Sequence, residues 1–130
     1  MLLTVEHLRS AYHGVHFGLA QNLRLELRRQ VDTLFADVDL LITPTTPTGP
    51  FELSDEVLGD AGVADHQSNG GLLNTCPLDL TGHPALSIPS GIGEHNLPTA
   101  LQIIGPAFGE TRVYQAAFAF ERATGPLPPI

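Results

Sequence analysis

The sequence contains no lysine. Six arginines face fourteen acidic residues, which gives a formal net charge of −8. Nucleic-acid binding depends on clustered Lys and Arg against phosphates, and the only adjacent basic pair is Arg28–Arg29. We therefore expect no nucleic-acid partner. The absence of lysine also excludes any mechanism in which an amine side chain of this chain acts as the base.

Cysteine is almost absent as well. The single Cys76 excludes a disulfide within the chain and favours a cytoplasmic location. Because Cys76 precedes Pro77 in an apolar stretch, we interpret it as a small core residue and not as a nucleophile. No apolar run approaches the roughly 20 residues of a membrane span, and no signal peptide precedes the first basic residue, Arg9. These features predict a soluble, cytoplasmic chain without a membrane partner.

The length and composition are those of one globular domain. The chain has 130 residues, of which 42% are hydrophobic and 15% charged, enough to bury a core. We predict a single domain over residues 1–130, with an extended tail at 126–130, where prolines prevent further helix. Most of the remaining prolines lie in the middle of the chain, which predicts short strands and fixed turns there.

The N-terminal part predicts helix over residues 4–36, with Thr4 as the N-cap. Apolar residues recur every three or four positions and form one stripe: Leu8, Tyr12, Val15, Leu19, Leu23, Leu27, Val31 and Leu34. Gly14 and Gly18 each cost about 1 kcal/mol inside a helix. A break into two helices between residues 13 and 18 is therefore expected.

Three short apolar runs predict buried strands, at residues 40–43, 84–89 and 100–104, since Gly or Pro lies close to their ends. A Pro-rich loop follows the first run, and a long acidic loop extends to residue 71. Residues 110–123 predict a helix that Gly125 terminates. This order indicates the α/β class. Because the strands are apolar throughout, we expect a sheet that is covered on both faces, and this chain has too few helices to cover both by itself.

Without reference to a known family, no group of residues in the sequence indicates a catalytic or metal site. His13 and His16 could share a helix face, but a metal site needs a third ligand nearby. Ser90 lacks the glycine two positions before it that a nucleophile elbow requires. Gly91 and Gly93 are followed by no helix, so they form no dinucleotide fingerprint. We expect no cofactor.

Three segments in order nevertheless resemble the C-terminal part of the amidase signature family: Asp39-Leu-Leu-Ile-Thr-Pro-Thr-Thr-Pro47, Thr81-Gly-His-Pro-Ala-Leu-Ser-Ile-Pro-Ser-Gly91 and Leu97-Pro-Thr-Ala-Leu-Gln-Ile-Ile-Gly-Pro106. A Phe-Gly-Glu sequence at 108–110 and a final helix containing Glu121 complete the series. The resemblance implies a partial amidase-signature-type fold. That fold has a mixed β-sheet flanked by helices, a long N-terminal helical segment and a C-terminal helix.

The resemblance also implies hydrolysis of amide C–N bonds by a Ser–Ser–Lys triad, which needs no cofactor. This chain has no lysine and no Gly-Gly-Ser-Ser stretch, so we assign it no catalytic residue. We expect a truncated, C-terminal segment that is inactive alone and meets a small amide substrate only when the N-terminal part is present. By position, Thr45, Thr46 and Pro47 are candidates for the wall of the substrate pocket, together with the loop 51–71.

Two alternatives remain open at this point. The chain could be a degenerate, non-catalytic binding or subunit module that pairs with a partner chain, or a decayed gene product without a function. A sheet that lacks neighbouring strands exposes unpaired backbone groups, so we also expect self-association into a homo-oligomer. The sequence does not choose among fatty, aromatic or small amide substrates.

Overall fold

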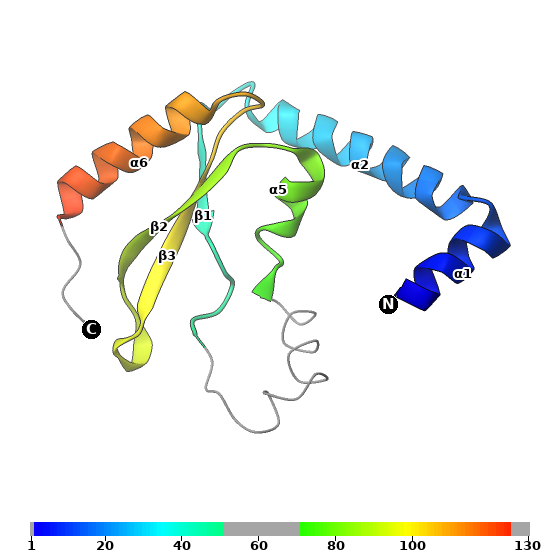
Figure 1. The fold of residues 1–130 in the computed structure, drawn as a ribbon. Helices are drawn as coiled ribbons and strands as arrows, with labels where there is room; N and C mark the ends of the chain where they lie inside the picture. Colours follow the sequence, from blue (N-terminus) through cyan, green and yellow to red (C-terminus); the bar gives the residue numbers. More distant parts are fainter. Residues whose placement is uncertain (1, 51–70, 126–130) are drawn as a thin grey trace.

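The computed structural model describes residues 2–50 and 71–125, in which helices and a small sheet alternate (Figure 1). The elements in chain order are α1 (Leu2–Tyr12), α2 (Val15–Leu34), β1 (Leu41–Pro44), α5 (Cys76–Thr81), β2 (Ala85–Ile92), the 3₁₀ helix η2 (Glu94–Asn96), β3 (Pro98–Ile104) and α6 (Glu110–Thr124). The predicted tail 126–130 and all but Gly71 of the predicted loop 51–71 lie outside the described residues.

The three strands form one sheet in the order β1-β3-β2. Both pairings are antiparallel, and Ile103 lies opposite Ile42 on one side and Leu86 on the other. The α/β class and the three predicted strands are confirmed, although β2 continues past Pro89, through a register shift, to Ile92. Among the described residues no parallel pairing occurs, so the sheet is antiparallel here where a mixed one was expected.

One face of the sheet packs against α6. The buried residues Ile88 and Ile103 of the sheet meet Val113 and Ala117 of the helix, which lie four positions apart on one side of it. The helix begins where it was predicted and ends before Gly125, whose φ of 72° allows the chain to leave the helix. This layer of sheet and helix is the hydrophobic core.

The opposite face carries Gln102 and Ile104, both buried, because neighbours along a strand point to opposite faces. The short helix α5 lies on this side of the sheet, next to α2 (Figure 1). The sequence did not predict α5, and the interpretation of Cys76 as a core residue is wrong: the side chain is exposed. The buried positions of α5 are Leu78 and Thr81, three apart, so Cys76 lies on the other side of the turn.

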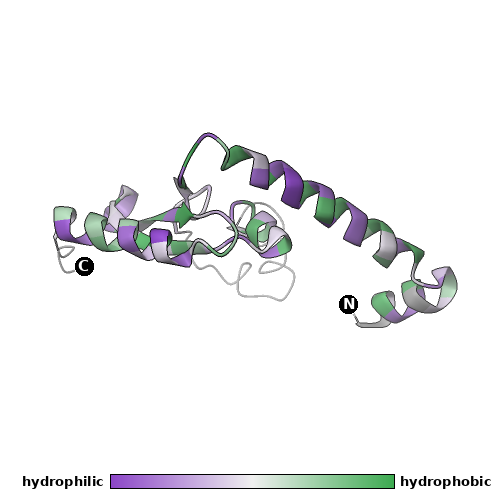
Figure 2. Cartoon of the chain, turned by 90° about the horizontal axis from the view of Figure 1, so that it is seen from above, coloured by the Kyte–Doolittle hydropathy of each residue, from purple (hydrophilic) through white to green (hydrophobic). Residues whose placement is uncertain are grey.

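Helices α1 and α2 form an arm that extends away from the sheet (Figures 1 and 2). The predicted break is confirmed at His13 and Gly14, which have φ of 50° and 80°. Thr4 is not an N-cap, because α1 already begins at Leu2. The stripe of apolar residues is mostly exposed, and α2 has no buried residue. No helix in the described ranges combines the length and apolar character needed to cross a bilayer.

Candidate functional site

A cavity of about 410 Å³ opens where the end of β1 meets the start of β3. One wall is the loop that follows β1, residues 44–50, which we call the proline loop; Pro98, Thr99 and Ala100 form the other wall, and Gly71 closes part of the rim. Thr45, Thr46 and Pro47, the pocket-wall residues expected from the sequence, all line this cavity. The structure therefore brings the three together around one space, although it holds no substrate.

The lining is made of hydroxyl, proline, glycine and alanine residues. No described residue of the lining is charged or a histidine, so the cavity as described contains no candidate general base. A lining of this kind can exclude water and fit an apolar group, while the two types of polar group present, hydroxyls and backbone amides, can orient a ligand.

Hydrogen bonds hold the first residues of the proline loop. The Thr45 amide donates to the carbonyl of Ala100 at 3.2 Å, which continues the β1–β3 ladder into the loop. The hydroxyl of Thr45 lies 2.7 Å from that of Ser87 on β2, and the hydroxyl of Thr46 donates to the carbonyl of Thr48 at 2.8 Å. The pocket wall is thus attached to both of the other strands.

A buried amide lies behind this wall. Nε2 of Gln102 donates to the backbone carbonyl of Asn74 at 3.0 Å and to Oγ1 of Thr43 at 3.3 Å. Nδ2 of Asn74 in turn donates to the carbonyl of Pro44 at 2.9 Å. The sequence alone does not predict this group, because Gln102 lies within an otherwise apolar strand. The signal was present, since Gln102 is the single polar residue in that run.

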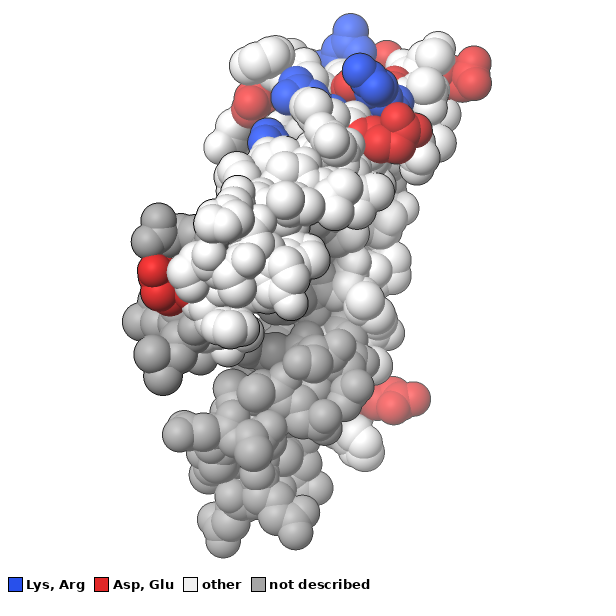
Figure 3. Space-filling model, turned by 90° about the vertical axis from the view of Figure 1, so that its right-hand side faces the viewer, with Lys and Arg blue, Asp and Glu red and all other residues white. Residues whose placement is uncertain are grey.

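Two further hollows lie on the surface. One, of about 610 Å³, shares the second half of the proline loop and is bounded on its other side by the β2–β3 turn, including Glu94 and His95. The other, of about 390 Å³, lies at the junction of α1 and α2 between Val5, Leu8 and Phe17. Most of the charged side chains visible in Figure 3 gather toward the top of this face, and the described surface just below them is white, that is, uncharged.

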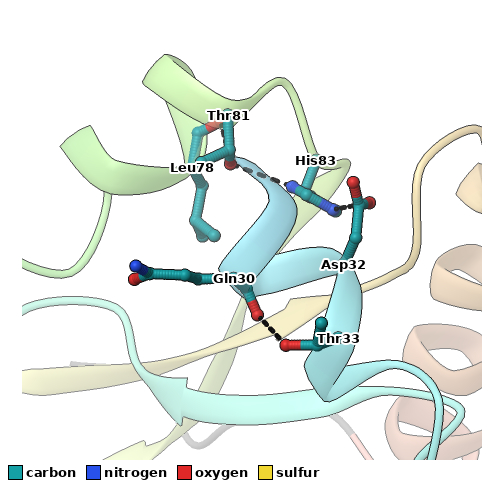
Figure 4. Close-up of polar contacts among 6 residues, drawn as sticks. All are labelled: Gln30, Asp32, Thr33, Leu78, Thr81 and His83. Carbon is teal, nitrogen blue, oxygen red and sulfur yellow. Dashed lines mark hydrogen bonds and ion pairs between the residues drawn. The ribbon is translucent and has the colours of Figure 1, made fainter. Parts of the chain in front are cut away.

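His83 lies at the centre of a polar network on the α5 side of the sheet (Figure 4). Its ring is fully buried, with Nδ1 2.9 Å from the hydroxyl of Thr81 and Nε2 3.1 Å from a carboxylate oxygen of Asp32. The hydroxyl of Thr81 also lies 3.3 Å from the carbonyl of Leu78, and Phe35 stacks on the ring. Both ring nitrogens are occupied, so His83 joins α2 to α5 and is a structural residue.

The remaining candidates do not form sites. Ser90 contacts the hydroxyl of Thr99 at 3.2 Å and lies on an exposed strand end. His16 packs edge-to-face against Tyr12. In the ranges that the structure describes, no three His, Cys, Asp or Glu residues are grouped closely enough to hold a metal ion.

Comparison with known proteins gives a consistent result. The model of the family described as Amidase matches residues 4–114. The A subunit of the glutamyl-tRNA(Gln) amidotransferase of Mycobacteroides abscessus is 38% identical over 122 residues, which are 93% of this chain and 24% of that protein. The corresponding protein of Bacillus mycoides is 38% identical over 117 residues, 90% of this chain and 23% of the relative.

A solved structure extends the comparison to the fold. The crystal structure of the same amidotransferase component from Thermotoga maritima superposes with a TM-score of 0.71 at 28% sequence identity, covering 93% of this chain and 25% of that one. The matched region is the C-terminal part of these relatives. The chain thus spans about a quarter of the length of the proteins that it matches.

Proposed function

The chain belongs to the amidase family, and we propose that it provides the C-terminal scaffold and part of the substrate-pocket wall of an enzyme that hydrolyses amide C–N bonds. One observation carries this proposal. The 410 Å³ cavity is lined by the proline loop and by residues 98–100, and residues 44–47 and 98–100 belong to the first and third of the segments that resemble the family. Residues far apart in the sequence thus form one concave site.

The wall acts by shape and not by bond cleavage. Thr45, Thr46 and Pro47 exclude water from one side of the bound amide and limit the size of its acyl group. The described lining has no base and the chain has no lysine, so the Ser–Ser–Lys residues that the family resemblance implies come from outside this sequence. The chain alone is therefore inactive, and the small amide becomes a substrate only beside that catalytic part.

The experiment is a complementation. One of the amidotransferase relatives, with its matching C-terminal quarter removed, is expressed alone and together with this chain, and amide hydrolysis is measured over fatty, aromatic and small amides. We expect activity only when both pieces are present. Activity of this chain alone, or no activity of a mixture that forms a stable complex, would contradict the proposal.

A matched variant tests the pocket wall itself. Replacement of Thr45, Thr46 and Pro47 together by alanine should change the preference among the amides while leaving complex formation intact. The comparison is the Thr33→Ala variant, whose side chain lies on exposed α2 and does not line the cavity. An unchanged substrate profile of the triple variant would remove these residues from the pocket wall.

A second function is favoured by the exposed arm. Apolar side chains of α1 and α2, including Phe17 and Leu23, face solvent in the described chain, as expected of a surface that another chain covers. A non-catalytic module would use this surface and have no part in hydrolysis. A stable complex with a partner chain, without amidase activity in any mixture, would favour this function over the first.

A further inference from the structure

The proline loop receives support from a residue that does not touch the cavity. Gln102 lies on β3, two residues after Ala100 of the cavity wall, but its side chain is on the α5 side of the sheet and only 4% of the residue is exposed. Burying an amide costs free energy unless its donors are paired. Both hydrogen bonds from Nε2 are therefore needed, and one of them ends on Asn74.

Asn74 connects Gln102 to the proline loop. Its backbone carbonyl accepts from Gln102 while its side chain donates to the carbonyl of Pro44, the first residue of the proline loop. Pro44 lies opposite Leu101 in a pair whose backbone groups do not bond to each other, because the bonded pair is Thr45 with Ala100. The Pro44 carbonyl thus points away from β3, toward the free edge of β1, and Asn74 is its partner.

We propose that Gln102 is a positioning residue for the substrate pocket: its amide holds Asn74 against the carbonyl of Pro44, and this fixes the proline loop in the shape that binds the ligand. The chain of contacts runs from a buried strand residue, through the segment before α5, to the pocket wall. The inference rests on the proposed function only in treating the cavity as a ligand site. It assigns Gln102 no contact with the ligand.

The Thr43 contact supplies a control. Gln102 also donates to Oγ1 of Thr43, and this bond does not lead to the proline loop. Thr43→Val removes it and leaves the link through Asn74. Gln102→Met keeps the side-chain length and removes both bonds, whereas Asn74→Ala removes only the bond to Pro44. Gln102→Met and Asn74→Ala thus break the connection between Gln102 and Pro44, whereas Thr43→Val removes a hydrogen bond of Gln102 and keeps that connection.

The first readout is hydrogen exchange measured by mass spectrometry on the whole chain, followed on the peptide that covers residues 41–50. We expect Gln102→Met and Asn74→Ala to speed exchange in this peptide, while Thr43→Val and the α6 peptide stay as in the unchanged protein. Should Gln102→Met fail to fold, Gln102→Leu, which also removes both bonds, takes its place. Equal exchange in all variants, or faster exchange throughout the molecule, would overturn the inference.

The second readout is binding of benzamide, a small amide probe, to the complex of this chain with the truncated relative used in the complementation, followed by ligand-detected NMR. Gln102→Met and Asn74→Ala should each weaken the binding of benzamide about threefold to tenfold, which corresponds to the loss of about one hydrogen bond. Thr43→Val should leave the binding unchanged. A link variant that speeds loop exchange but leaves the Kd unchanged would overturn the positioning role. If benzamide does not bind the complex with the unchanged chain, the proposed pocket fails, and the exchange experiment still decides whether Gln102 holds the loop.

Discussion

At the scale of single residues, the network around His83 depends on one hydroxyl. Thr81 is fully buried and its Oγ1 is the partner of Nδ1 of His83. Valine has the same shape without the hydroxyl, so Thr81→Val leaves a buried ring nitrogen unpaired. We expect a loss of about 1–3 kcal/mol in the free energy of unfolding, measured by urea denaturation.

Thr33→Val is the matched control for this change. Thr33 also makes a hydrogen bond through its hydroxyl, to the carbonyl of Gln30 (Figure 4), but its side chain is exposed. Water replaces the lost partner there, so the expected effect is within about 0.5 kcal/mol. Equal effects of the two substitutions would mean that the His83 network does not stabilise the fold.

The pair Ile42 and Ile103 offers a second test, because the two residues lie opposite each other on one face of the sheet. Ile103 is 2% exposed and packs against α6, whereas Ile42 is 67% exposed. Ile103→Ala should reduce the free energy of unfolding by about 2–5 kcal/mol, the cost of a cavity in a core. Ile42→Ala should cost much less, and a similar loss at both positions would show that another surface covers Ile42.

At the scale of elements, the sequence predicted the helices and strands whose ends are marked by Gly or Pro. Pro84 precedes β2, Gly105 follows β3, and Gly125 ends α6 with a positive φ, although β2 continues past Pro89 to Ile92. The break in the N-terminal helix was predictable from Gly14 for the same reason. These signals are local, because they depend on which backbone angles a residue allows.

The missed features depend on contacts between distant segments. Helix α5 has six residues, too few for a periodic pattern, and it is held by packing against α2 and by the bond from Arg24 to the carbonyl of Leu80. Gln102 and Asn74 are 28 positions apart, and no spacing along the chain relates them. Residues 45–47 line a cavity, as expected for a pocket wall, but their role in binding substrate stays a prediction. The buried link behind them could be found only from the coordinates.

Replacement by alanine should have opposite effects on stability at two glycines, one at the end of α5 and one inside α2. Gly82 ends α5 with φ of 76°, and its amide donates to the carbonyl of Leu78. Gly18 lies inside α2 with no atom within 4 Å of an added Cβ. Gly82→Ala should cost about 1–2 kcal/mol, because alanine is strained in the left-handed region. Gly18→Ala should increase helix content, since alanine is favoured by about 1 kcal/mol in a helix.

Circular dichroism and thermal unfolding of both variants check this pair. Neither substitution fills space, because no atom lies within 4 Å of the added Cβ at either site, so the difference reports backbone preference alone. A loss of helix content in Gly18→Ala would contradict this expectation and would mean that α2 needs glycine at position 18.

At the scale of the whole molecule, the buried side chains are concentrated in the sheet and in the helices on its two faces. The sheet, α6 and α5 bury side chains, whereas α1 and α2 extend away from them (Figure 2). Many apolar residues of these two helices are exposed. The sheet of the described residues also has two free edges, because β3 is the central strand. Either kind of surface could drive the self-association that the sequence predicts.

The two edges differ in what they offer to another strand. On β1 the outward positions are Ile42 and Pro44; proline has no amide hydrogen, and Asn74 occupies its carbonyl. On β2, Gly105 of the chain after β3 donates to the carbonyl of the residue before Ala85. Because bonded and non-bonded pairs alternate along an antiparallel ladder, the backbone groups of Ala85 and Ser87 point outward. The edge of β2 is therefore the better template for pairing.

We expect the arm to dominate over this edge in self-association, because its exposed apolar side chains recur along both helices while the β2 edge presents two amides. Leu23 is 71% exposed at the middle of α2, so Leu23→Glu should shift the chain toward monomer in sedimentation experiments at increasing concentration. Ala85→Pro removes an outward amide without a ladder bond and should change the association little. The reverse result, with Ala85→Pro alone producing monomer, would place the contact at the sheet edge.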